Sequence, residues 1–161
     1  MTIKVGDKLP DSTFMTMGAD GSPKPVATRD VFAGKKVALF AVPGAYTPTC
    51  HKQHMAGFVQ NYDELKRKVD VVACTAVNDV FVLTAWAKDS KADGKIHMLA
   101  DGSAEFAKKL GLDIDLTARG LGVRSKRYSM VVEDGVIKSL NVEDAPPNHD
   151  KSSAAAMCKM L

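Results

Sequence analysis

The pattern of hydrophobic and polar positions changes period several times along the chain, which predicts strands and helices in alternation. A continuous apolar run at residues 37–42 indicates a buried strand that ends at Pro43-Gly44. Apolar side chains at positions 55, 58, 59, 62 and 65 then recur at helical spacing, with polar residues between them. A second apolar run at residues 69–77 predicts another buried strand, so the three segments form a β-α-β unit.

Three further segments continue the alternation. Residues 79–90 predict a helix whose apolar side chains fall mostly on one side, and we expect these to be core: Phe81, Leu83 and Trp86. Residues 95–101 predict a short strand, and residues 103–112 predict another helix. Residues suited to helix ends lie at the boundaries: Asn78 or Asp79 and Asp101 or Ser103 at the starts, and Gly111 at the last end.

The C-terminal part of the chain predicts a hairpin and a final helix. Residues 127–143 alternate around Asp134-Gly135, which is a strong hairpin signal, and residues 150–161 have a helix-favouring composition. Residues 1–36 predict a short strand and loops, with a hairpin around residues 18–24. A parallel unit that continues into an antiparallel hairpin predicts one α/β domain over residues 1–161, with a mixed central sheet flanked by helices.

Composition and charge narrow the functional classes. The chain has 161 residues, a net charge of +3 and 6% aromatic residues, and its basic residues are dispersed, so we expect no nucleic-acid partner. No apolar run approaches the length of a membrane span, and the first residues lack the apolar stretch of a secretory signal. We therefore expect no membrane association and a cytoplasmic protein.

The three cysteines, Cys50, Cys74 and Cys158, do not form a disulfide framework, which indicates free thiols in a reducing compartment. No cysteine or histidine pair has the spacing of a structural zinc site, so we expect no metal. Cys74 lies inside an apolar strand and is expected to be buried and inert. Cys158 lies near the C-terminus, where it could be a surface thiol or a partner for another thiol.

The segment TPTC, residues 47–50, gives Cys50 a distinctive position. Thr47 is a good N-cap and Pro48 suits the first helical position, which places Cys50 in the first turn of the helix. The partial positive charge of a helix N-terminus favours thiolate over thiol. The free amides of Thr49 and Cys50 can bind a second polar group beside the sulfur. Cys50 is therefore a candidate nucleophile, although a cysteine here could also be a small apolar filler.

Other polar residues have plain alternatives. His54 lies one helical turn after Cys50 on the same face, where it could orient a neighbour or promote the thiolate, or could simply be solvated. Arg124, Lys126 and Arg127 are expected to be surface cations when they are judged from local sequence alone.

Three segments resemble a known family. PGAYTPTC, with Pro43, Thr47 and Cys50, matches the PxxxTxxC pattern of peroxiredoxins. The run through HKQHMAGF, and then VVACTAVNDVFV and RYSMVVEDGVIKSLNVE, resemble the atypical type II branch, also called the peroxiredoxin-5 type. The resemblance extends over residues 5–143 and implies a thioredoxin-like fold.

The resemblance also implies an activity and residue roles. It implies thiol-dependent reduction of hydrogen peroxide and alkyl hydroperoxides, without a metal or organic cofactor. Cys50 would be the peroxidatic cysteine, Thr47 would hydrogen-bond the peroxide and Pro43 would shield the site. Arg127 matches the family's active-site arginine, so the resemblance implies a site residue where local sequence implied a surface cation. His54 matches a supporting histidine of the family. The family often has proline where this chain has Ala56, and we expect only a slight change in helix geometry there.

Reduction of the oxidised cysteine is the step where this chain departs from some relatives. The segment APPNHDKSS lacks the resolving cysteine that these relatives carry before the last helix. Cys74 matches a second redox cysteine of some plant-type members but is expected to be buried, and Cys158 lies too late in the chain. We expect a one-cysteine cycle with glutathione, glutaredoxin or thioredoxin as the reductant. The resemblance further implies a homodimer.

Two other functions use the same thiol. A redox sensor or binding protein would be oxidised at Cys50 without fast turnover. A thioredoxin-like disulfide reductase would need a second cysteine at CxxC spacing, which Cys50 lacks. Catalytic consumption of peroxide with a thiol reductant distinguishes the peroxidase from the sensor.

Overall fold

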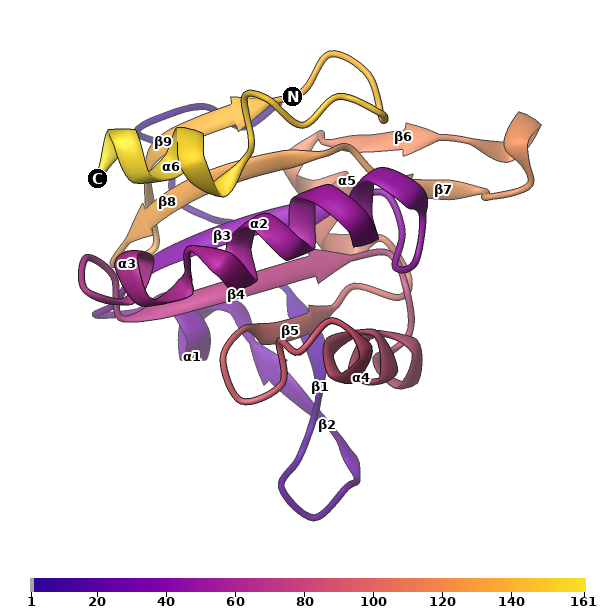
Figure 1. Cartoon of the computed structure of the whole chain (residues 1–161), viewed down its shortest axis with the longest axis horizontal. Coiled ribbons are helices and arrows are strands. Elements are labelled where there is room, and N and C mark those ends of the chain that lie inside the picture. Colours follow the sequence, from indigo (N-terminus) through magenta and orange to yellow (C-terminus); the bar gives the residue numbers. More distant parts are fainter. Residues whose placement is uncertain (1) are drawn as a thin grey trace.

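The computed structural model describes residues 2–161 and has three layers, with helices on both faces of a central sheet (Figure 1). The sheet order is β2-β1-β5-β4-β3-β8-β9. β3, β4 and β5 run parallel, whereas β1 and β8 pair antiparallel with β5 and β3. The strands are β1 (Thr13–Met17), β2 (Pro23–Ala27), β3 (Lys36–Val42), β4 (Val71–Ala76), β5 (His97–Ala100), β8 (Tyr128–Glu133) and β9 (Val136–Val142). The predicted mixed sheet flanked by helices is confirmed.

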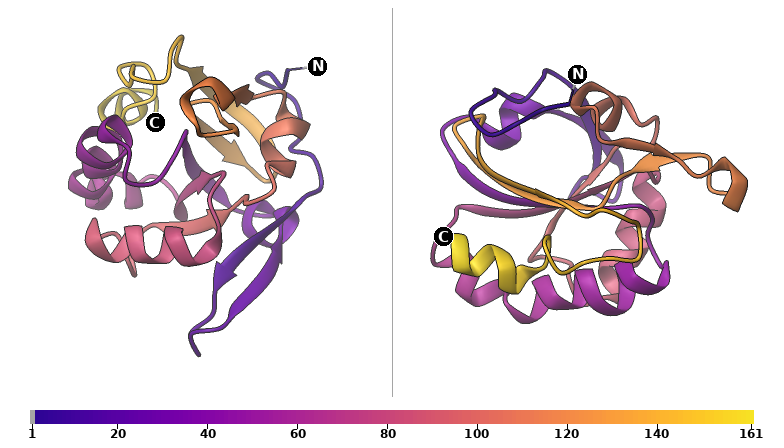
Figure 2. Two further views of the ribbon diagram at one scale, coloured as in Figure 1. Left: turned by 90° about the vertical axis from the view of Figure 1, so that its right-hand side faces the viewer. Right: turned by 90° about the horizontal axis from the view of Figure 1, so that it is seen from above.

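The helices divide between the two faces of the sheet, as the view from above in Figure 2 shows. One core lies under η1, α2, α3, α4 and α6, and the other lies under α1 and α5. The helices are α1 (Thr28–Phe32), η1 (Cys50–Met55), α2 (Ala56–Gln60), α3 (Tyr62–Lys66), α4 (Val80–Asp89), α5 (Glu105–Leu110) and α6 (Ala154–Met160). No helix within residues 2–161 combines the length and apolar character that crossing a membrane requires.

The continuous apolar run at residues 37–42 is explained by the burial of strand β3 on both faces of the sheet. Ala38, Phe40 and Val42 enter one core, and the alternate residues 37, 39 and 41 enter the other. Because successive side chains of a strand point to opposite faces, a strand covered on both sides must be apolar throughout. β3 lies between β4 and β8, so its carboxyl end is close to residues from both neighbours.

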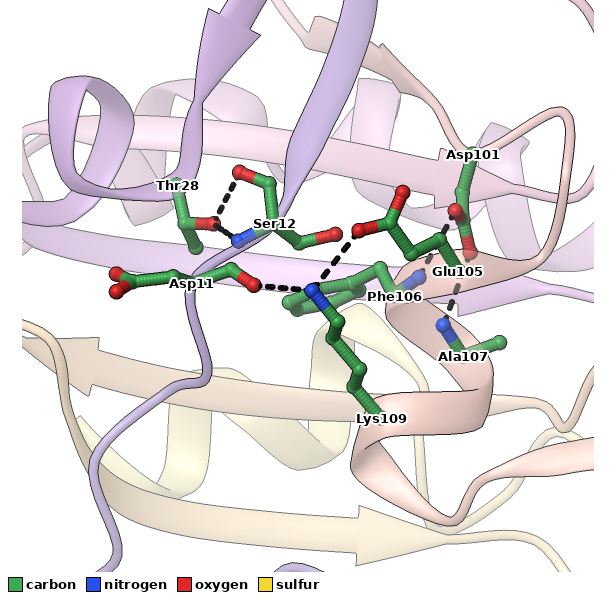
Figure 3. Close-up of polar contacts among 8 residues, drawn as sticks. All are labelled: Asp11, Ser12, Thr28, Asp101, Glu105, Phe106, Ala107 and Lys109. Carbon is green, nitrogen blue, oxygen red and sulfur yellow. Dashed lines mark hydrogen bonds and ion pairs between the residues drawn. The ribbon is translucent and has the colours of Figure 1, made fainter.

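The ends of α5 follow the predicted signals. The Asp101 carboxylate accepts hydrogen bonds from the amides of Phe106 (3.0 Å) and Ala107 (2.9 Å), as Figure 3 shows. Gly111 ends the helix with a positive φ of 70°, a conformation that costs glycine little. Asp101, and not Ser103, therefore satisfies the first amides of this helix.

Helix α4 confirms one prediction and contradicts another. Asp79 is its N-cap and accepts a 2.8 Å hydrogen bond from the Val82 amide. Leu83 and Trp86 are buried as predicted, but Phe81 is 63% exposed. The buried stripe of this helix is Val80, Leu83, Trp86 and Ala87, and Phe81 is one position out of phase with it.

Both predicted hairpins are present. Asp134 and Gly135, with φ of 49° and 77°, form the turn between β8 and β9, and β1 pairs with β2 around residues 18–22. Three short elements were not predicted: helix α1 and the strands β6 (Asp113–Asp115) and β7 (Val123–Ser125). The two strands pair antiparallel in a separate two-stranded sheet, and the 3-10 turn Thr117–Arg119 lies between them. Each has only three to five residues, too few to show a period.

The predicted helix after β3 contains a wider segment. η1 is a π-helix, in which each amide bonds the carbonyl five residues back. Cys50, His54 and Met55 are all buried, and the i, i+4, i+5 spacing places them on the same side of a π-helix. Apolar and reactive side chains therefore face the interior together in the first turns.

Candidate active site

The loop from β3 to Cys50 is held by hydrogen bonds from its own residues and from the next strand. The Ala45 amide donates to the Asn78 side chain (3.0 Å), which follows β4. The Thr47 hydroxyl donates to the Gly44 carbonyl (2.8 Å). The carboxyl ends of β3 and β4 thus fix the entrance to the helix, where open α/β sheets place their ligands.

Thr47 occupies the predicted N-cap position, but its hydroxyl does not cap the helix. Its carbonyl accepts the amide of His51 (2.8 Å), whereas its hydroxyl is used on Gly44. The first-turn amides of Thr49 and Cys50 have no acceptor one turn earlier in the helix. A hydroxyl that donates one hydrogen bond still has lone pairs to accept another. The helix entrance therefore offers amide donors and one hydroxyl acceptor beside the sulfur.

Arg127 lies directly against Cys50. Its Nη2 is 2.9 Å from Cys50 Sγ, and both residues are buried. The β3–β8 register pairs Tyr128 with Ala41, so the residue before Tyr128 lies at the carboxyl end of β3. The surface reading of Arg127 is wrong, and its reading as an active-site arginine agrees with this position.

Three of the five N–H groups of the Arg127 guanidinium are paired. Nη1 contacts His54 Nδ1 (3.0 Å), Nε donates to the Pro146 carbonyl (3.0 Å), and Nη2 donates to Cys50 Sγ. No carboxylate within residues 2–161 forms an ion pair with this buried cation. A buried charge without a counter-ion is costly, so these three hydrogen bonds are what compensates for the burial of the guanidinium.

His54 is buried between aromatic rings and has a fixed tautomer. Its ring centroid is 5.0 Å from Phe40 and 5.4 Å from Phe58. Because Nδ1 faces an Arg127 donor, Nδ1 accepts, and Nε2–H donates to the Ser152 carbonyl (2.8 Å). Burial, and then the charge of Arg127, lower the pKa of His54 from 6.5 to about 3. His54 is therefore neutral near pH 7. The solvated reading of this histidine is wrong, because its ring is buried against Arg127.

The lowered pKa of His54 predicts a pH-dependent stability. Its folded pKa of about 3 is below the ordinary value of 6.5, so the unfolded chain binds more protons between these values. The stability from neutral His54 is complete above about pH 6.5 and is lost toward pH 3, at about 1 kcal/mol per pH unit. We expect the free energy of unfolding in urea to fall more steeply below about pH 6 than in His54→Gln.

Glutamine is a suitable control because its amide can accept from Arg127 and donate to Ser152 without titrating. His97, whose pKa burial also lowers, is present in both proteins, and its contribution cancels in the comparison. Parallel pH profiles of the two proteins would contradict a buried neutral His54.

The other two cysteines lie outside this arrangement of hydrogen bonds. Cys74 is fully buried in β4, and burial, followed by the neighbouring Cys50, raises the pKa of its thiol well above the usual range. Cys158 is half-buried in α6, and burial, followed by Glu64, raises the pKa of its thiol. All three cysteines are free. A thiol with a raised pKa stays protonated near neutral pH, so neither Cys74 nor Cys158 suits nucleophilic attack there.

Local sequence carries no signal for three further residues near the site, which are Arg124, Glu143 and Ser152. Arg124, read as an exposed cation, is half-buried and donates to the carbonyls of Leu121 (2.8 Å) and Pro43 (3.4 Å). Lys126, given the same reading, is also half-buried. The buried Glu143 and Ser152 belong to the segment before α6. They join the site only through contacts made in the folded chain.

The site is small and lies apart from the larger surface pockets. Four pockets of about 330–340 Å³ have no lining residue among Pro43, Thr47, Cys50, His54 and Arg127. Within residues 2–161 no three histidine, cysteine or acidic side chains gather as a metal site requires. Cys50 itself is fully buried.

Comparisons with known proteins agree with this geometry. The Redoxin family model matches residues 4–158. The chain is 48% identical to chloroplastic peroxiredoxin-2E of Arabidopsis thaliana, over 99% of this chain and 70% of the relative. It is 43% identical, with a TM-score of 0.93, to reduced Prx3 of Vibrio vulnificus in complex with hydrogen peroxide, over 99% of each chain. Peroxiredoxin 5 of Alvinella pompejana is 34% identical, with a TM-score of 0.85, over 98% of this chain and 96% of that one.

These findings confirm the predicted thioredoxin-like fold and the predicted family resemblance. They contradict the prediction of a cytoplasmic protein, because the Arabidopsis relative and a rice relative at 46% identity are chloroplastic. That prediction rested on free cysteines and on the composition of the first residues, and neither feature distinguishes one reducing compartment from another.

Proposed function

Since this chain belongs to the Redoxin family and is a peroxiredoxin of the type II, peroxiredoxin-5-like branch, we propose that Cys50 carries its thiol-dependent peroxidase reaction. One observation supports this role above the others: the buried Arg127 directs Nη2 at Cys50 Sγ over 2.9 Å and has no carboxylate partner within residues 2–161. A guanidinium placed in this way stabilises a sulfur anion, which is the nucleophilic form of cysteine.

The oxidation step follows from thiol chemistry. The Cys50 thiolate donates an electron pair to the terminal oxygen of a hydroperoxide, so an S–O bond forms as the O–O bond breaks. The departing hydroxide or alkoxide takes up a proton, equivalent to the one that Cys50 lost on ionising. The products are a sulfenic acid on Cys50 and water or an alcohol. Cys50 is oxidised by two electrons and the hydroperoxide is reduced by two.

The surrounding groups act on the charge that develops on the peroxide oxygens. Two N–H groups of Arg127 remain unpaired within residues 2–161, and the first-turn amides of Thr49 and Cys50 are further donors. The Thr47 hydroxyl, which already donates to Gly44, accepts the hydrogen of the incoming hydroperoxide. Donors fixed before the reaction need no rearrangement when the O–O bond lengthens, so they lower its barrier.

Reduction of the sulfenic acid requires a second thiol. The buried, protonated Cys74 is a poor candidate, and Cys158 belongs to a different helix, α6. We infer that an external thiol of glutathione, glutaredoxin or thioredoxin attacks the Cys50 sulfenate, forms a mixed disulfide and releases water. A second thiol then regenerates Cys50.

Treatment of the reduced protein with equimolar hydrogen peroxide tests both proposals. We expect mass spectrometry after dimedone trapping to find a sulfenate on Cys50 alone. Without a reductant, we expect no intramolecular disulfide, because Cys74 and Cys158 have raised pKa values and stay protonated. An abundant bridge from Cys50 to either thiol would refute the one-cysteine cycle, and oxidation of another cysteine would refute the role of Cys50.

The assembly and location of the chain are inferred from weaker support. Phe81 (63% exposed) and Tyr46 (45% exposed) present aromatic surface on segments that follow the carboxyl ends of β4 and β3. Such surface supports a homodimer that packs near the active site, which sedimentation velocity can test. The chloroplastic relatives support a plastid location.

A further inference from the structure

The segment between β9 and α6, residues 143–153, is a loop that we refer to as the strap (Figure 1). It contacts the buried Arg127 and His54. Two of its backbone carbonyls bind the site from one side. The Pro146 carbonyl accepts from Arg127 Nε (3.0 Å), and the Ser152 carbonyl accepts from His54 Nε2 (2.8 Å). Neither carbonyl takes part in the oxidation of Cys50.

Glu143, the first residue of the strap, is hydrogen-bonded to Ser152 near the other end of the strap. One oxygen of its carboxylate accepts both the Ser152 amide and the Ser152 hydroxyl, each at 2.6 Å. Both residues are buried, with exposed fractions of 7% for Glu143 and 0% for Ser152. The Glu143 amide in turn donates to the Arg127 carbonyl (2.9 Å), so the first residue of the strap is bonded to the backbone of Arg127. Hydrogen bonds to an ionised carboxylate are roughly twice as strong as neutral ones.

The contacts form a continuous chain that ends at the sulfur. Glu143 fixes Ser152, the Ser152 carbonyl fixes the tautomer of His54, and His54 Nδ1 accepts from Arg127, whose Nη2 donates to Cys50. A small pocket of about 50 Å³ beside this contact is lined in part by Arg127, Glu143 and Pro146. Side-chain packing is incomplete on that side of Arg127, so the hydrogen bonds to the strap contribute to holding the guanidinium in place.

We propose that Glu143 and Ser152 are positioning residues of the peroxidase, which hold Arg127 against Cys50 through the Ser152 carbonyl and the neutral ring of His54. A purely structural role, in which Glu143 only anchors the start of α6, would affect stability alone. The proposal rests on the proposed role of Cys50. The new element is that the strap, which contains no cysteine in this chain, holds Arg127 in position beside Cys50.

The test compares Glu143→Ala, Glu143→Gln and the matched control Asp144→Ala in the full chain. Asp144 is the next residue, and within residues 2–161 its exposed side chain has Lys151 as its one hydrogen-bond partner (2.8 Å). We expect Glu143→Ala to lower the rate constant for hydrogen peroxide reduction by about 10- to 100-fold, as a displaced catalytic group does. The rate of Cys50 alkylation by iodoacetamide near pH 7 should fall with it. Glu143→Gln keeps an acceptor for both Ser152 donors and should restore most of both rates, whereas Asp144→Ala should change neither.

A spectroscopic signature separates positioning from stability. Nitrogen-15 spectra of the wild-type ring should show neutral His54 protonated at Nε2, assigned by its loss in His54→Gln. That single-tautomer signature should become mixed in Glu143→Ala. If Glu143→Ala does not fold, Ser152→Ala removes only the hydroxyl contact, and we expect a drop of about threefold in both rates.

Two results would overturn the inference. A Glu143→Ala protein with the wild-type rates and His54 signature, but a lower urea midpoint, would leave Glu143 a structural role only. The same would hold if Ser152→Ala left both rates and the signature unchanged. Oxidation or alkylation of the wild-type protein at a cysteine other than Cys50 would instead refute the proposed function, so the two failures are distinguishable.

Discussion

Cys50→Ser is expected to lower the rate of hydrogen peroxide reduction by at least about 10⁴-fold, the scale seen when an enzyme nucleophile is removed. A serine hydroxyl stays protonated near neutral pH, and oxygen is a far weaker nucleophile toward peroxide than a thiolate. Serine is similar in size and can be accommodated in the buried position, so the loss would reflect chemistry and not unfolding. Stopped-flow measurement of peroxide consumption with excess thiol reductant gives the rate.

Cys74→Ala and Cys158→Ser are the matched controls. Cys74 is fully buried with a raised pKa, and Cys158 is half-buried in another helix, so neither change should remove the nucleophile. Both variants are expected to keep most of the wild-type rate. Residual fast turnover in Cys50→Ser, or its loss in Cys74→Ala, would show that a different thiol attacks the peroxide.

Arg127→Met is expected to slow the reaction by about 10²- to 10³-fold, the usual effect of removing one fixed donor that stabilises a transition state. Methionine fills much of the space of the arginine side chain but has no charge and no N–H group. The substitution removes the 2.9 Å contact to Cys50 Sγ and leaves the His54 Nδ1 and Pro146 carbonyl acceptors unpaired. We expect both peroxide reduction and iodoacetamide alkylation of Cys50 to slow, because both need the thiolate.

Lys126→Met is the matched control, since Lys126 is the preceding residue and its side chain makes no hydrogen bond to Cys50, His54 or Arg127 within residues 2–161. It loses one positive charge in the same segment and should retain the wild-type rate. Arg127→Lys keeps the charge but lacks the planar fork that bonds three acceptors at once, so we expect an intermediate rate. A wild-type rate in Arg127→Met would remove Arg127 from the reaction.

The buried cation also explains why these residues depend on one another. Arg127 replaces its lost hydration with three partners: His54, the Pro146 carbonyl and the Cys50 sulfur. His54 cannot be the counter-ion, because its pKa of about 3 leaves the ring neutral. Removing any one of these three partners would therefore leave the buried guanidinium less well compensated.

The sequence by itself determined the elements and the position of the thiol. The apolar run that became β3, the helical spacing after it and the Asp134-Gly135 turn are local patterns, and each predicted its element correctly. The TPTC segment placed Cys50 in a first helical turn because caps and helix entry depend on neighbouring residues. Local rules failed where a period could not be read, as for α1 and β6, or was read one position out of phase, as for Phe81.

Only the tertiary structure decided which groups meet the sulfur. Cys50 and Arg127 are 77 residues apart, and the β3–β8 register brings them together. The tautomer of His54 depends on a carbonyl 98 residues away, and the anchoring of that carbonyl by Glu143 left no local signal. Hydrophobic periodicity records which face of an element is buried but not which residue lies opposite it. The partners of a buried charge are set by strand register and loop closure, which exist only in the folded chain.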